Sequence, residues 1–114
     1  MKVNILTLML FFSTSLVHAT GYTGEGLITE MFVGAGNIVG VFHSGTKFNP
    51  KGCSIASSDD AYLFDYSSTA DMSKVYAMLL SAYISKTPVK IGVNSSSCHA
   101  NFPVIDRVAF GKGY

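Results

Sequence analysis

Cys53 and Cys98 are the residues whose chemistry the sequence constrains most sharply. Two cysteines in an exported chain pair by default, because the compartment is oxidising. A disulfide that closes this loop of 46 residues would stabilise the fold by about 4 kcal/mol on chain-entropy grounds. The alternative is a metal site formed by the two cysteines and His99. That set lacks a fourth ligand and a closely spaced pair, so we predict a disulfide, no metal site and no cofactor.

His43 and His99 are the histidines that follow the leader described below, and either could serve as a general base. His43 is next to Ser44, and His99 follows the serine run at residues 95–97. No glycine-flanked nucleophile motif surrounds any serine. Asp59 and Asp60 stand in a serine-rich loop, where aspartate usually makes turns. We therefore predict no catalytic residue, and a small hydrolase is the least favoured function.

Tyrosines are abundant, and a tyrosine can stack on a sugar ring while polar neighbours bind its hydroxyl groups. Tyr76 and Tyr83 recur at helical spacing, which predicts a place in a helix core. Tyr62 and Tyr66 fall at strand spacing, which predicts packing on one face of a sheet. These four are assigned to packing rather than to a ligand.

Tyr22 is the better ligand candidate, because it stands in the glycine-rich segment at residues 20–26, which has no packing pattern. We call this segment the lead. We predict that Tyr22, Thr23 and Glu25 bind a ligand. The recognition surface is expected in two loops, Tyr22–Gly26 and Ser44–Ser58.

A helix is expected to position these groups, running from about Ser68 to Lys86 and prevented from continuing by Pro88. Ser68 and Asp71 have capping-box spacing. One face of this helix is apolar: Met72, Val75, Tyr76, Leu79, Leu80 and Tyr83. The other face carries Lys74 and small residues: Ser73, Ala77, Ser81 and Ser85. The small face would either pack against a second copy or remain exposed to solvent.

Five strands are expected around this helix, at 27–33, 38–43, 61–66, 89–93 and 104–110. Gly40 predicts a bulge or sharp coiling in the second strand. Asn94–His99 is expected to be a loop. The predicted fold class is mainly β with one helix: an OB-fold-like five-stranded Greek-key barrel with the helix between strands 3 and 4. The alternative is an α+β sheet with one helix across its face.

The first residues have the pattern of a secretory signal peptide. Lys2 is followed by the apolar run Ile5–Val17, and Ala19 ends a small-residue cleavage motif. We predict a signal peptide at residues 1–19, a single OB-like domain at residues 20–114, and a secreted or periplasmic location. No later stretch is long and apolar enough to span a membrane.

Charge is balanced in the predicted domain, where seven basic and seven acidic residues remain without Lys2. Nucleic acid binding needs a concentrated basic face, so nucleic acid is excluded as a predicted partner. The expected partners are a glycan or protein ligand and, through the small helix face, further copies of the chain.

The stretch Gly26–Gly34, the helix end Tyr83–Ile91 and the leader resemble those of small secreted bacterial OB-fold proteins. The group includes toxin B subunits of the subtilase-cytotoxin and typhoid-toxin type and unassigned relatives with a similar cysteine layout. The resemblance implies a pentamer that binds host-cell glycans and delivers a separate catalytic subunit. In the sialic-acid-binding relatives a serine ahead of the first strand contacts the sugar. That position is Gly24 here, and Thr23 is the neighbouring hydroxyl.

Two functions follow as hypotheses. The first is a secreted, non-enzymatic binding module that recognises a glycan or a protein. The alternative is a structural or protein-interaction protein of the periplasm or cell surface, without a small ligand.

Overall fold

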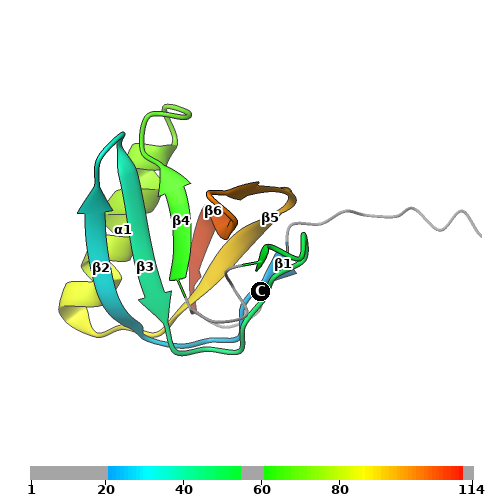
Figure 1. Ribbon diagram of the computed structural model, residues 1–114. Helices are drawn as coiled ribbons and strands as arrows, with labels where there is room; N and C mark the ends of the chain where they lie inside the picture. Colours follow the sequence, from blue (N-terminus) through cyan, green and yellow to red (C-terminus); the bar gives the residue numbers. More distant parts are fainter. Residues whose placement is uncertain (1–20, 55–60, 112–114) are drawn as a thin grey trace, which may run out of the picture.

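The computed structural model describes residues 21–54 and 61–111, and the predicted signal peptide at residues 1–19 lies outside this part. The described chain is mainly β with one helix, as predicted (Figure 1). Its elements are β1 (Gly21–Tyr22), β2 (Ile28–Gly34), β3 (Ile38–His43), β4 (Ala61–Asp65), α1 (Met72–Ser85), β5 (Val89–His99) and β6 (Phe102–Phe110). The lead thus contributes a short strand, so the described sheet has six strands rather than five.

The strands follow the order β1-β5-β6-β4-β3-β2. All neighbouring pairs are antiparallel except β4 and β6, which are parallel. The two edge strands, β1 and β2, belong to one run of chain. Between them, Gly26 exchanges two backbone hydrogen bonds with Val89 at the start of β5, with N···O distances of 3.0 and 2.8 Å. The sheet is therefore curved, so that the single run of chain that holds β1 and β2 pairs with β5 through β1 and with β3 through β2.

The predicted loop at Asn94–His99 is wrong, because β5 continues to His99 and pairs with Phe102. Ala100 and Asn101 connect β5 to β6 with φ angles of 48° and 67°, so both residues of this tight turn are left-handed. The serine run still folds locally: the Asn94 side chain accepts from the Ser96 amide at 2.8 Å, where the register of β5 is irregular. Serine-rich composition hid a strand that is distorted but continuous.

Gly40 does not carry the predicted bulge, since the register shift in this hairpin falls between Ile28 and Glu30 on β2. Gly40 faces Phe32 across the strands, and a Cβ at Gly40 would collide with the Phe32 ring. An aromatic ring lying over a glycine covers backbone that would otherwise meet water. Gly40 thus marks a close approach of the Phe32 ring to the backbone of β3.

Helix α1 begins at Met72, four residues later than predicted. The predicted capping box is absent: Asp71 is the N-cap without a side-chain cap bond, and the Ser68 hydroxyl donates to the Asp65 carbonyl at 2.8 Å. The helix ends at Ser85; its C-cap, Lys86, has a left-handed φ of 54° and lies two residues before Pro88. Ser68 thus belongs to the turn that precedes the helix, three residues before the N-cap.

Helix α1 packs against β2 and β6, and in Figure 1 it lies behind β2, β3 and β4. The buried helix residues are Met72, Val75, Leu79 and Ala82. Tyr83, predicted in the core, is instead 39% exposed, while Tyr76 is half-buried. Strand β4 is central in the sheet and buried on both faces, which is why Tyr62 is only 1% exposed.

Candidate functional site

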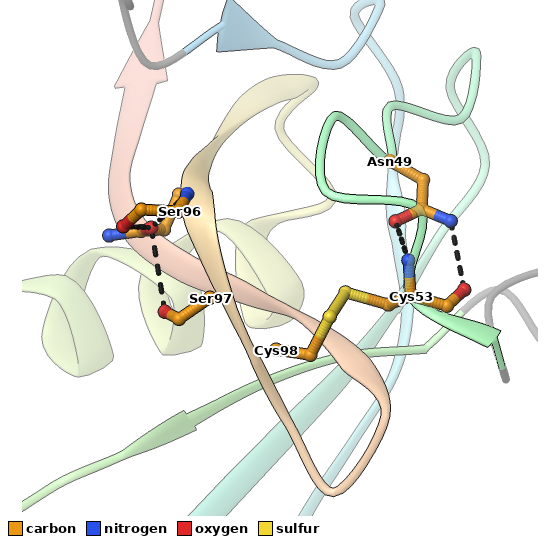
Figure 2. The surroundings of a disulfide bond; sticks show 6 residues. Asn49, Cys53, Ser96, Ser97 and Cys98 are labelled. Carbon is orange, nitrogen blue, oxygen red and sulfur yellow. Dashed lines mark hydrogen bonds between the residues drawn. A yellow bond between two sulfur atoms is a disulfide. The ribbon is translucent and has the colours of Figure 1, made fainter.

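The predicted disulfide is confirmed: Cys53 and Cys98 are bonded, joining the loop after β3 to the end of β5 (Figure 2). The Asn49 side chain holds the Cys53 backbone at both ends, donating to its carbonyl at 2.9 Å and accepting from its amide at 2.8 Å. Both sulfurs are therefore unavailable to the alternative metal site with His99. Within residues 21–54 and 61–111, no group of three metal-ligating side chains occurs.

Thr23, one of the predicted ligand residues, is only 3% exposed. Its hydroxyl accepts from the Ile91 amide at 3.0 Å and donates to the Gly24 carbonyl at 2.9 Å. Its own amide donates to the Ile91 carbonyl at 2.9 Å. The hydroxyl thus completes the pairing of the lead with β5, and binding a ligand would require breaking those bonds.

Tyr22 and Glu25 remain ligand predictions, in different surroundings. The Tyr22 ring is half-buried on β1 with the Arg107 guanidinium 5.6 Å from its centroid, a cation–π distance. The Arg107 stem crosses Gly92, where a Cβ would collide with it. Glu25 is exposed. The three predicted ligand residues therefore lie in different surroundings: the Tyr22 ring packs against Arg107, the Thr23 hydroxyl is buried, and Glu25 is exposed.

A cavity of about 260 Å³ lies at the turn end of the β2–β3 hairpin. Its lining residues, which we call the tyrosine cup, are Val33, Asn37, Val39, Tyr66 and Tyr76. The two tyrosine rings meet edge to face, with centroids 5.6 Å apart and planes at 88°. The Tyr66 amide donates to the Asn37 carbonyl at 2.8 Å, which fixes this end of β4 to the hairpin turn.

Polar groups border the tyrosine cup. Tyr66 is 42% exposed, and in the described part of the chain neither cup tyrosine hydroxyl has a hydrogen-bond partner. The neighbouring Asp65 carboxylate accepts from the Ser67 hydroxyl at 2.6 Å and from its amide at 2.8 Å. These bonds hold the pKa of Asp65 below its usual value. The cup thus combines apolar ring surfaces with the Asn37 amide and two tyrosine hydroxyls, and an ionised carboxylate directly precedes Tyr66 in the chain.

A second cavity, of about 410 Å³, lies at the other end of β2 and is lined by Leu27, Ile28, Thr29, Tyr83 and Lys86. Ile84, which follows the lining residue Tyr83 near the end of α1, is 72% exposed. The surface between this helix end and the start of β2 therefore carries exposed apolar side chains beside Thr29 and Lys86.

His43 is buried at 4% exposure, and both ring nitrogens contact backbone. Nε2 lies 2.8 Å from the Val89 carbonyl oxygen, and Nδ1 accepts from the Gly45 amide at 3.2 Å. The ring thus lies where the lead crosses from β5 to β3. We call this region the seam, formed by Thr23, Gly26, His43, Gly45 and Val89. A histidine bonded on both sides to backbone is positioned for structure rather than for general base catalysis.

Comparisons with protein-family models, with curated proteins and with solved structures found no match. No helix in the described ranges has the length and apolar character needed to cross a bilayer.

Sequence reasoning missed the tyrosine cup, although each tyrosine was noted. The strand pattern placed Tyr66 on a buried sheet face, but Tyr66 follows the last residue of β4 and stands exposed. The usable signal was its position between Asp65 and Ser67, both turn formers. The partners from the β2–β3 hairpin, Asn37 and Val33, become neighbours only through the sheet topology.

Proposed function

We propose that this protein is an exported, non-enzymatic binding module that recognises a glycan through the tyrosine cup. The observation that carries this proposal is the edge-to-face pair of the exposed Tyr66 and the half-buried Tyr76, in the lining of a cavity that also holds Asn37. The apolar face of a sugar ring stacks on tyrosine, while side-chain amides and hydroxyls bind sugar hydroxyl groups. The cavity is in the size range of a saccharide unit rather than of a long polymer.

The proposal includes the OB-like barrel as scaffold. It is supported by the run of chain Gly21–Gly34, which pairs with β5 and with β3, and by the helix that follows β4. Function does not follow from such a fold, because sites are placed on folds independently. The tyrosine cup therefore carries the argument, and the fold explains how hairpin and helix residues meet there.

A glycan array followed by calorimetry tests the proposal. Tyr66→Ala should weaken binding of any captured glycan at least tenfold, equivalent to about 1.4 kcal/mol. Tyr83→Ala is the matched control, because Tyr83 is similarly exposed at 39% but lines the other cavity. A glycan bound equally well by Tyr66→Ala and lost in Tyr22→Ala would move the site to the lead. An array without any bound glycan at high protein concentration contradicts the glycan proposal.

The alternative is a protein-interaction role, which the apolar surface around Leu27, Tyr83 and Ile84 favours. Large exposed aliphatic and aromatic side chains in one area are typical of protein contacts. Under this alternative, Ile84→Lys would abolish recovery of a specific partner from the producing cell, while Tyr66→Ala would not.

Export and a toxin-like ring are further parts of the proposal. The disulfide is what an oxidising compartment permits, and N-terminal sequencing of the protein from the producing cell tests cleavage after Ala19. Light scattering on a size-exclusion column tests the ring. A monomer at all concentrations removes the pentamer, and an exported enzyme encoded next to this chain would support a catalytic partner.

A further inference from the structure

Hydrogen bonds identify the form of the buried His43 ring. A backbone N–H can only donate, so Nδ1, which accepts from the Gly45 amide at 3.2 Å, carries no proton. The neutral ring then has its proton on Nε2, which donates to the Val89 carbonyl oxygen at 2.8 Å. His43 is therefore a neutral bridge between the end of β3 and the start of β5.

The bridge lies at a place with no spare room. A Cβ on Gly26 would meet the Gly45 backbone, and a Cβ on Gly45 would meet the Gly24 carbonyl and the His43 ring. The same Val89 carbonyl also accepts from the Gly26 amide at 3.0 Å. One carbonyl thus holds both the lead and β3, and a change at the ring acts on both.

We propose that His43 is an acid-sensitive latch: a proton taken up from solvent by Nδ1 breaks the bond to Gly45 and loosens the seam between β3 and β5. The protonated ring carries an N–H at both nitrogens. At Nδ1 this N–H would point at the N–H of Gly45, so two donors would face each other. The seam must open, or Gly45 must turn away, before the cation becomes stable.

The direction of the pH effect follows from burial. Desolvation lowers the pKa of His43, and this outweighs the backbone contacts with Val89 and Gly26, which favour the cation. The unfolded chain, with an ordinary histidine pKa of about 6.5, therefore takes up its proton at a higher pH than the folded chain. The seam keeps its full stability above that value and loses it as the pH falls toward the lowered folded value.

Charged side chains do not account for the lowered pKa of His43. The ionisable residues nearest in sequence to the contacts of His43 are Glu25 in the lead, Lys47 after Gly45, and Lys86 and Lys90 around the start of β5. None of the four contributes to the shift in His43. The latch depends on the ring, its burial and two backbone bonds.

Nuclear magnetic resonance and hydrogen exchange of the unaltered protein provide the first test. The His43 ring should titrate at lower pH in the folded protein than in the same protein unfolded in urea. Between pH 7 and pH 5, after correction for intrinsic exchange, protection of the Gly26, Gly45 and Val89 amides should fall at least tenfold. Protection of the Val39 and Leu63 amides should change less. Equal loss at all five amides, or a ring that titrates as in urea, overturns the proposal.

A variant pair provides the second test. His43→Gln keeps one donor and one acceptor without a titrating group, so its urea midpoint should vary less with pH over this range than that of the parent. His99→Gln is the matched control and should keep the parent's dependence. An unchanged pH dependence in His43→Gln contradicts the latch. Should His43→Gln fail to fold, the exchange experiment on the parent decides alone.

Discussion

The seam and the tyrosine cup are both formed where the chain leaves a strand, yet they are opposite in character. In the seam, the Thr23 hydroxyl and the His43 ring are buried, and each is hydrogen-bonded to backbone on two sides. In the cup, Tyr66 is exposed, and within residues 21–54 and 61–111 the polar contacts around it are those of the backbone and of the Asp65 turn. Buried polar groups whose hydrogen bonds are all made within the protein give the seam a rigid structure. Exposed polar groups held on a rigid support, as in the cup, can bind a ligand.

Removal of the disulfide, which belongs to neither the seam nor the cup, should have the largest effect on stability. Replacing Cys53 and Cys98 together with serine should lower the free energy of unfolding by about 4 kcal/mol, because the long loop is then free in the unfolded chain. Urea denaturation measures this. The control is the parent protein with reductant, which should lose the same amount. A change below about 1 kcal/mol would show that residual structure already restrains the unfolded loop.

Gly26→Ala breaks the seam by volume. Its Cβ would lie against the Gly45 backbone, which has no flexible end to move aside, so we expect a loss of about 1–3 kcal/mol. Gly34→Ala is the control, since a Cβ there meets Ile38 at an ordinary 3.9 Å. Thermal and urea unfolding of the two variants measure the difference. Equal stability of both would mean that the seam is looser than these contacts indicate.

Thr23→Val distinguishes a structural role from the ligand role that the sequence predicted. Valine keeps the shape but leaves the Ile91 amide unpaired in a buried place, which costs about 1–3 kcal/mol. Thr29→Val, at an exposed hydroxyl with a 3.4 Å contact, should cost less. If Thr23→Val instead keeps full stability and loses ligand affinity, the hydroxyl serves recognition.

Tyr66→Ala should have the smallest effect on stability while reducing affinity. Its ring gives up one edge-to-face contact and little buried area, so we expect a loss of about 1 kcal/mol. The unfolding midpoint in urea measures it. A loss as large as that of Gly26→Ala would make the cup part of the core and weaken its assignment as a binding site.

Features that depend on residues close together in the sequence could be predicted, and features that depend on distant residues could not. Helix α1 was predicted within a few residues, because a repeat of apolar residues is a local signal. The disulfide was predicted because the chain has only two cysteines. The coarse fold class, mainly β with one helix, followed from the order of strands and helix. The sixth strand and the pairing of one segment with both β5 and β3 depend on contacts distant in sequence.

The remaining differences have physical causes in particular residues. Thr23 looked like a free hydroxyl because a glycine-rich lead has no burial pattern, and only its pairing with Ile91 buries it. The end of β5 looked like a loop because serine favours turns, while the opposite strand, which begins at Phe102, keeps the segment extended. The cup needs a hairpin and a helix start that no sequence window contains together.

The pairing of Gly21 with Val93 has a consequence for the order in which the molecule is made. During synthesis the lead is produced early and its partner strand late, so the lead has no edge to join until most of the chain has left the ribosome. Joining the two is a long-range event of the kind that slows folding. The joint between β1 and β5 therefore cannot close until β5 has been synthesised, and the early end of the fold stays open until then.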